Sequence, residues 1–225
     1  MGKPKLDTSK VGGLAFFVSL IFLGLLGVCN LLTLLRPWSG EAIRNLALFA
    51  ATLFVGFAIG AVCIRNHLAI FIHELKHAIV ANLAGNKARG WRIRRNHGHF
   101  EYSFTRETAA WNAFISLAPY WFPLFTIPAL MVAAAGWHGN HLIMVACAGL
   151  AFGADCSLNL RDVAPHQTDF TNLRGGFTVG VAYTAVMNLT LGTILVAWVL
   201  GGREGLVLLL NGLSTLMHLV VSRVR

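Results

Sequence analysis

The sequence has few charged residues for its length. Lysine, arginine, aspartate and glutamate together make up 12% of the 225 residues, whereas 56% are hydrophobic. A soluble domain carries about 25% charged residues, so the composition argues against a soluble globular protein. Apolar runs recur along the whole chain, and we therefore expect a single polytopic membrane domain over residues 1–225, all α-helical in fold class.

The chain has only four cysteines, and their positions argue against two further classes of protein. The four cysteines fall in apolar segments and have neither the spacing of a zinc-binding motif nor that of a disulfide framework. Buried cysteines of this kind usually behave as small hydrophobic residues. They are Cys29, Cys63, Cys147 and Cys156.

The apolar runs predict the membrane spans. The first, at 11–35, is too long for the hydrophobic region of a signal peptide and lacks a small-residue cleavage site, so we expect it to be a retained span. A span needs about 20 apolar residues, and on that rule the predicted spans are 12–35, 45–64, 111–135, 141–160, 176–200 and 205–221.

A further helix over 66–84 makes the number of spans six or seven. Continuous helix from 42 to 85 would be about 65 Å long, twice the thickness of the hydrocarbon core. We therefore expect a break at 64–67, with Asn66 as the N-cap of the next helix.

The net charge of +9 points to lipid rather than to nucleic acid as the partner. The basic residues lie in short loops and tails between apolar runs, and not on one folded face. Such residues mark cytoplasmic loops and contact the anionic leaflet. The loops at 85–107 and 161–174 and the C-terminal tail are therefore expected in the cytoplasm, whereas the side of the N-terminus depends on whether there are six or seven spans.

The segment 85–107 is the part of the chain with strand character. The alternating stretches "RGWRIR" and "HFEYSF" flank the turn-forming "NHGH". This pattern predicts a small β-hairpin, associated with the membrane, after the preceding helix.

The stretch "HELKH" within 66–84 carries the chemistry. His73 and His77 are four residues apart, so on a helix they project from one face and can bind one metal ion. Glu74 follows the first histidine, where in this motif the carboxylate acts as general base rather than as a ligand. Polar groups in so apolar a segment are costly to bury, which favours a functional site.

A catalytic zinc ion takes three protein ligands and leaves a fourth position for water. The third ligand must therefore come from elsewhere in the chain. The acidic residues on the same side of the membrane are Asp155, Asp162 and Asp169, with His166 as a further candidate.

Three motifs resemble the site-2 protease family of intramembrane zinc metalloproteases. They are "HELKH", the helix opening "AFISLAPYWFPLF" and the late "NLRDVAPHQTDF". The resemblance covers about 66–173, which would be the core of the domain, with flanking helices at 12–64 and 176–221. It implies hydrolysis of peptide bonds within or next to transmembrane segments of membrane protein substrates.

The family pattern also implies roles for single residues. His73 and His77 match the zinc-binding histidines and Glu74 the catalytic glutamate. The family's second motif matches best with Asp169 as the third ligand and Asn159 as a residue that orients ligands or the bound water. The match departs from the family because Phe170 follows the aspartate, the separation is longer and Lys76 replaces the usual glycine, so Asp162 stays an alternative ligand.

The hairpin has two readings. Family members are thought to hold substrate as an extended strand, and the edge formed by Arg92, Ile93 and Arg94 would suit strand addition. Alternatively, the hairpin is a basic amphipathic loop on the anionic leaflet.

Two other functions remain open. A metal or proton transporter would use the histidines and aspartates as a transit site, and a catalytically inactive homologue would bind clients without cutting them. The expected location is a bacterial inner membrane with the site towards the cytoplasm. Substrate identity and oligomeric state are beyond the sequence.

Overall fold

The computed structural model describes residues 12–93, 98–136, 141–173 and 175–224. It is mostly helical, with one antiparallel two-stranded sheet. The elements in chain order are α1 (Gly12–Leu35), α2 (Gly40–Cys63), α3 (Asn66–Leu83), β1 (Lys87–Ile93), β2 (Gly98–Ser103), η1 (Thr108–Trp111), α4 (Asn112–Ser116), η2 (Ala118–Tyr120), α5 (Thr126–Gly136), α6 (His141–Arg161), α7 (Thr168–Thr171) and α8 (Gly176–Val224).

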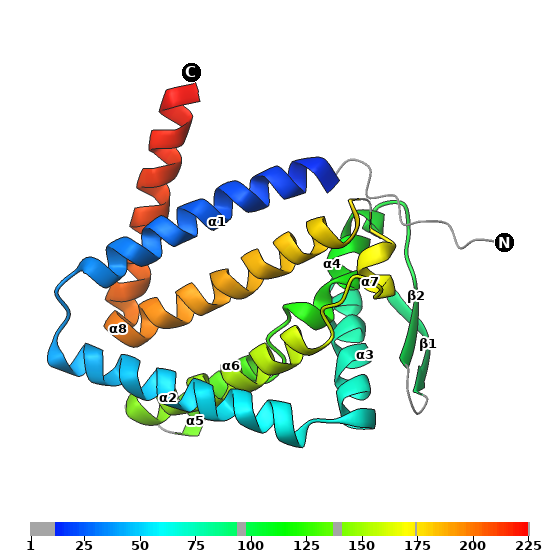
Figure 1. Ribbon diagram of the computed structural model, residues 1–225, viewed down its shortest axis with the longest axis horizontal. Coiled ribbons are helices and arrows are strands. Elements are labelled where there is room, and N and C mark those ends of the chain that lie inside the picture. The colour runs from blue at the N-terminus through cyan, green and yellow to red at the C-terminus, as the bar shows by residue number, and fades with distance from the viewer. Residues whose placement is uncertain (1–11, 94–97, 137–140, 174, 225) are drawn as a thin grey trace.

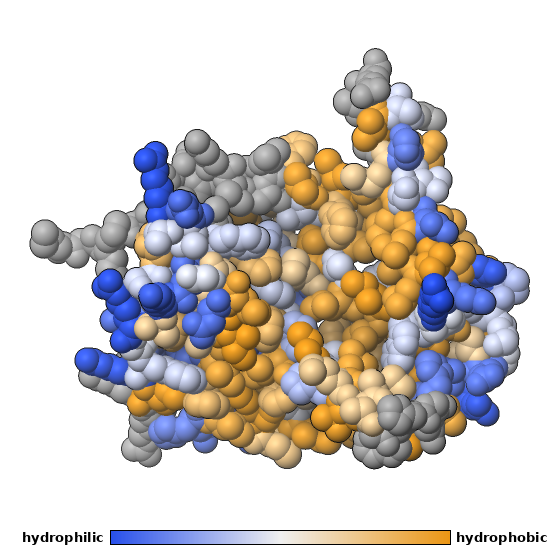
Figure 2. Space-filling view, turned by 180° about the vertical axis from the view of Figure 1, so that it is seen from behind, coloured by the Kyte–Doolittle hydropathy of each residue, from blue (hydrophilic) through white to orange (hydrophobic). Residues whose placement is uncertain are grey.

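Within those ranges, four helices are long and apolar enough to cross a membrane: Phe16–Leu35, Gly40–Cys63, His141–Arg161 and Gly176–Leu219. Figure 2 shows a broad hydrophobic surface with hydrophilic residues gathered at its two sides. These features indicate a mostly α-helical membrane protein. The predicted number of six or seven spans stays a prediction.

The long helices pack in pairs. In Figure 1, α1 runs beside the first part of α8, and α2 runs beside α6. Gly56 on α2 and Gly153 on α6 allow the second pair to approach closely, since a Cβ on Gly153 would overlap the Leu53 carbonyl and one on Gly56 the Leu150 carbonyl. Small residues at helix contacts of this kind are typical of membrane proteins.

The predicted break between α2 and α3 is confirmed, but its chemistry differs from the expectation. Arg65 is the N-cap residue and makes no side-chain capping bond, whereas Asn66 adopts a positive φ of 51° at the start of α3. Asparagine tolerates this left-handed conformation better than most residues. The Arg161 guanidinium donates to the carbonyls of Ala61, at 3.1 Å, and Ile64, which ties the end of α2 to the end of α6.

The helix α3 is not one of the four long apolar helices. Figure 1 shows it standing across the end of the pair formed by α2 and α6, with the sheet beyond it. The elements that follow the sheet pack against α3 through an apolar cluster around Ile115, Tyr120 and Phe170. The ends of the long helices and α3 thereby meet in one place.

The prediction of one span over 111–135 is wrong. The structure divides this segment into η1, α4, η2 and the 11-residue α5. Pro119 and Pro123 lack the backbone N–H that a continuous helix requires, so the helix cannot run through them. In contrast, the predicted end of a helix near residue 200 agrees with α8, which has non-helical dihedral angles at Gly202.

The predicted β-hairpin is confirmed as an antiparallel pair. Ile93 lies opposite Gly98 and Lys87 opposite Ser103, with an irregularity between Ala88 and Gly90. The stacked rings of Phe71 and Trp91 hold β1 against α3. The turn itself, residues 94–97, lies outside the described residues.

Candidate metal centre

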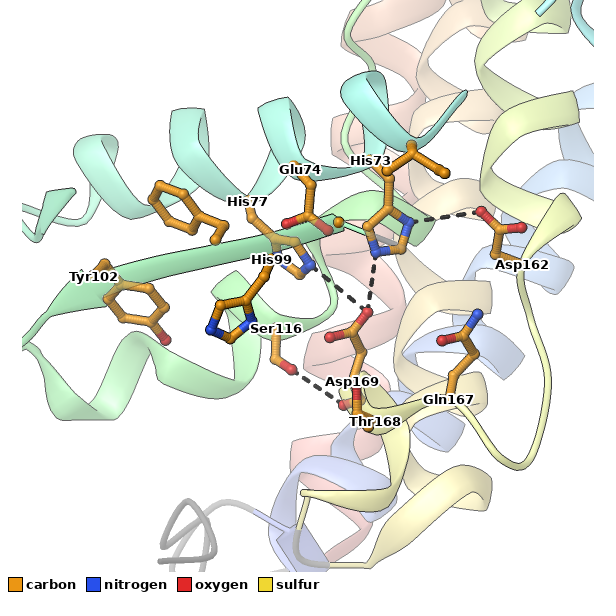
Figure 3. A pocket seen from close by; sticks show the side chains of 13 residues that line it. His73, Glu74, His77, His99, Tyr102, Ser116, Asp162, Gln167, Thr168 and Asp169 are labelled. Carbon is orange, nitrogen blue, oxygen red and sulfur yellow. Dashed lines mark hydrogen bonds and ion pairs between the residues drawn. The ribbon is translucent and has the colours of Figure 1, made fainter. Parts of the chain in front are cut away.

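The site begins with the helical periodicity of α3. His73, Glu74 and His77 line one cavity of about 390 Å³, which β2, Ser116, Asp162 and Asp169 also line. Figure 3 shows these side chains arranged around the cavity, with α3 along one side and β2 along another. The i, i+4 spacing thus places the two histidines on the same face of α3, as expected from the sequence.

The structure brings His73, His77 and Asp169 together into a group that could hold a metal ion. One potential ligand atom from each lies within 4.8 Å of the others. Asp169 Oδ2 lies 3.2 Å from His73 Nε2 and 3.6 Å from His77 Nε2. Ligand bonds of about 2.1 Å in a tetrahedral arrangement separate two ligand atoms by about 3.4 Å, so these distances suit a common ion.

The backbone orients His77. Its Nδ1 lies 2.8 Å from the carbonyl oxygen of Ile115. Because a carbonyl oxygen can only accept, Nδ1 carries the hydrogen and donates it. In the neutral ring the lone pair is then on Nε2, the atom that faces Asp169, as in metal sites whose ligating histidines donate their other N–H to an oxygen.

A carboxylate orients His73 in the corresponding way. Asp162 Oδ2 lies 3.6 Å from Nδ1 of His73, whereas Asp169 lies beside Nε2 of the same ring. The two aspartates that the sequence left as alternative third ligands are therefore on opposite sides of one imidazole (Figure 3). This geometry gives Asp169 the position of a ligand and Asp162 that of a residue that orients one.

Asp169 is held by two side chains from the segment before α5. The Tyr120 hydroxyl donates to Asp169 Oδ2 at 3.0 Å, and the Ser116 hydroxyl donates to the Asp169 carbonyl at 3.1 Å. Burial by itself would raise the pKa of Asp169, but the charges and hydrogen bonds of His77 and His73 outweigh it and hold the pKa of this carboxyl well below its ordinary value. The side chain is therefore a carboxylate, the form that binds metal.

Glu74 is buried and touches the hairpin. A Cβ on Gly98 of β2 would lie 2.7 Å from Cδ of Glu74, which is too close for a real contact. Glycine at this position therefore lets β2 pass directly over the glutamate. Figure 3 shows the Glu74 carboxylate between the two histidines, on the cavity side of α3.

β2 also supplies polar side chains to the cavity. The Tyr102 hydroxyl donates to Asn112 Oδ1 at 3.2 Å, and burial together with the charge of Asp169 raises the pKa of Tyr102 to about 12. His99 lies between Tyr102 and Asp169 in Figure 3, with its Nε2 2.9 Å from Glu101 Oε1. Both rings reach the space beside the three potential ligands.

The predicted substrate strand is next to the cavity and does not line it. Arg92 and Ile93 lie on β1, and the lining residues of the sheet come from β2. Arg94 lies outside the described residues. The binding of substrate at the edge of β1 stays a prediction.

The remaining polar residues of the motifs point elsewhere. Lys76 bonds to Asn159 Oδ1 at 2.6 Å, so the Asn159 side chain contacts α3 through this lysine. Asn159 has no hydrogen bond to His73, His77 or Asp169 among the described residues, and its predicted influence on the ligands would be indirect. Asp155, another candidate ligand from the sequence, is a fully buried carboxylate that is hydrogen-bonded to Thr126.

Sequence reasoning did not identify Tyr120, Gly98 or His99 as site residues. Tyr120 lies in the motif "AFISLAPYWFPLF", for which the sequence indicates no role of single residues, and the other two lie in the hairpin. Only the density of polar residues in "NHGHFEY" could have drawn attention to His99. Comparisons with known proteins add no relative, because no family model, curated protein or solved structure matches the chain.

Proposed function

We propose that this protein is a zinc endopeptidase that hydrolyses peptide bonds within or next to transmembrane segments of membrane proteins. The observation that carries the proposal is the convergence of His73 Nε2, His77 Nε2 and Asp169 Oδ2 beside Glu74, within one cavity. Two imidazoles and one carboxylate are a donor set of catalytic zinc sites. A glutamate directly after the first histidine is the general base of zinc peptidases that carry this motif.

The residues of the chain divide the chemistry between them. Zinc bound by His73, His77 and Asp169 would supply Lewis acidity towards water and the scissile carbonyl. Glu74 takes a proton from the attacking water as the new C–O bond forms, and returns it to the leaving amine nitrogen as the C–N bond breaks. Asp162 and the Ile115 carbonyl keep the two imidazoles in orientation.

The place of the site supports a membrane substrate. Asp162 directly follows α6, Asp169 lies in α7 shortly before α8 begins, and α3 begins shortly after α2 ends. The cavity is thus at the ends of the apolar helices, where a peptide that leaves a membrane span would pass. β2 lines the cavity beside Glu74, so an extended substrate segment would align along β2.

We also propose that the site faces the cytoplasm, in a bacterial inner membrane. Lys87, Arg89 and Arg92 lie on the hairpin beside the cavity, and Arg161 ends α6 at the same end of the helices. Basic residues mark the cytoplasmic side of membrane proteins. The same residues would hold the hairpin against the anionic leaflet.

The test compares the wild type with Glu74→Gln and with a matched control, Glu41→Gln, which changes an exposed glutamate at the start of α2. Each protein is purified in detergent, its bound zinc is measured, and cleavage of single-span membrane proteins is followed by mass spectrometry. We expect all three to bind zinc and Glu74→Gln to lose about 10²–10⁴-fold in cleavage rate. Full activity of Glu74→Gln would exclude the mechanism. Zinc binding without cleavage by the wild type would favour a transporter or a client-binding protein.

A further inference from the structure

Lys76 is a buried cation that the proposed reaction does not use. It lies on α3 immediately before His77 and is 1% exposed. Its Nζ donates to Asn159 Oδ1 at 2.6 Å and to the Pro119 carbonyl at 3.4 Å, and it lies 3.9 Å from Asp155 Oδ1. The side chain therefore extends from the metal-binding helix into the interface with α6.

The charge of Lys76 has a fully buried counterpart in Asp155. That carboxylate accepts hydrogen bonds from the backbone of Phe125 and Thr126 and from the Thr126 hydroxyl, the last two at 2.8 Å. These donors lie at the beginning of α5, where the helix dipole favours a negative charge. Asp155 therefore has three hydrogen-bond donors besides the ion pair, and Lys76 has a closer partner in Asn159, so the ion pair accounts for only part of the surroundings of the lysine.

The other partner of Lys76 leads back to the metal centre. Asn159 Nδ2 donates to Asn188 Oδ1 on α8 at 2.7 Å, and Asn188 Nδ2 donates to the Tyr120 carbonyl at 2.7 Å. The Tyr120 hydroxyl in turn donates to Asp169 Oδ2 at 3.0 Å. A series of hydrogen bonds, which passes through the backbone carbonyl and then the ring of Tyr120, thus joins the helix that carries both histidines to the residue that holds the third potential ligand.

We propose that Lys76 is a positioning residue, which fixes Asp169 relative to His73 and His77 through Asn159, Asn188 and Tyr120. The ends of the series are the two parts of the site that come from distant segments of the chain. Lys76, Asn159 and Tyr120 are buried, and Asn188 and Asp169 are partly buried, so loss of one partner leaves another unpaired and shifts its neighbours. This inference rests on the metal-binding part of the proposed function and not on the peptidase activity.

The first test replaces Lys76 by methionine and measures the site through cobalt. Co²⁺ occupies zinc sites and its visible absorption reports ligand geometry, so both its affinity and its spectrum are recorded for the detergent-purified protein. We expect Lys76→Met to weaken Co²⁺ binding by about 10–100-fold, the loss typical of residues that orient metal ligands, and to change the spectrum. The matched control is Asn30→Leu, which removes a 2.8 Å hydrogen bond to Thr193 between α1 and α8.

A second variant separates positioning from charge balance and covers the case in which Lys76→Met folds poorly. Lys76→Met with Asp155→Asn removes both buried charges together and still leaves Asn159 without its donor. We expect this double variant to fold and to keep the defect in cobalt affinity and spectrum. Recovery of wild-type cobalt binding in the double variant would overturn the proposal, since Lys76 would then be only half of a structural ion pair.

A double-mutant cycle tests the connection itself. If Lys76 acts through Tyr120, the variant with both Lys76→Met and Tyr120→Phe loses less cobalt affinity than the product of the fold-losses of the two single variants. Independent effects would overturn the connection. A wild type that binds cobalt but cleaves nothing would refute the peptidase while leaving this inference intact, whereas a wild type that binds no cobalt would refute both.

Discussion

Oδ2 of Asp169 lies 3.2 Å from Nε2 of His73, although 96 residues separate the two in sequence. On the other side of the same ring, Oδ2 of Asp162 lies 3.6 Å from Nδ1. One imidazole is thus held between two carboxylates, and only the nitrogen beside Asp169 also faces His77. The two aspartates should therefore affect the metal centre to different degrees.

We expect Asp169→Ala to abolish stable zinc binding because it removes a ligand. Asp162→Ala should still bind zinc but with an affinity about tenfold lower, because His73 loses the group that orients its ring. Both are measured by competition with a chelator on purified protein. The opposite order of effects would make Asp162 the third ligand.

Tyr120→Phe removes the one hydroxyl that donates to Asp169 Oδ2 among the described residues. The ring stays in its apolar cluster, so folding should be little affected. We expect zinc affinity to fall about tenfold, as for other residues that support metal ligands. Tyr183→Phe is the matched control, since that ring packs edge-on against Phe114 in the same cluster. Equal zinc affinity in the two variants would contradict the prediction.

Gly98→Ala should impair catalysis without removing the metal. The added Cβ would lie 2.7 Å from Cδ of Glu74 and force the carboxylate to move. Since a displacement of about 1 Å can reduce a rate about 100-fold, we expect a loss of cleavage rate of that order with unchanged zinc affinity. The control is Gly90→Ala on β1, where the one described atom within 4 Å of a Cβ would be Glu101 Oε2, at 3.9 Å. Wild-type cleavage by Gly98→Ala would show that β2 does not restrict Glu74.

Gly153→Ala should destabilise the pairing of α2 with α6. The new methyl group would overlap the Leu53 carbonyl, and this overlap is costly to relieve because the carbonyl belongs to the backbone of a helix. We expect a loss of about 1–3 kcal/mol, as for other overpacked contacts, measured by thermal unfolding in detergent. Gly24→Ala on α1 is the control, because a Cβ there has no neighbour within 4 Å among the described residues. A thermal midpoint equal to that of the control would exclude close α2–α6 packing.

Local sequence patterns predicted much of the fold because each reflects interactions between near neighbours. The apolar runs predicted the four long helices, and the alternation around the turn predicted the hairpin. The prediction of one continuous helix over 111–135 was wrong, since hydropathy alone does not reveal how Pro119 and Pro123 redirect the backbone. Nor could hydropathy show that α3 crosses the ends of the other helices.

The sequence likewise predicted one part of the candidate site and not the other. The i, i+4 spacing alone placed His73, Glu74 and His77 beside one another, because an α-helix repeats every 3.6 residues. The lysine between them had no explanation until its contacts with Asn159 and Asp155 were visible. Its direction depends on which helix lies against α3, and no short segment contains that information.

The sequence by itself therefore determined a helical membrane protein with two histidines and a glutamate on one helical face. Tertiary structure decided which aspartate lies beside Nε2 of both histidines, which strand covers Glu74 and where Lys76 points. Those relationships join segments as far apart as 96 residues. They follow from the packing of α3 against β2 and η2 and from its side-chain contacts with α6 and α7, which the local preferences of any one segment do not specify.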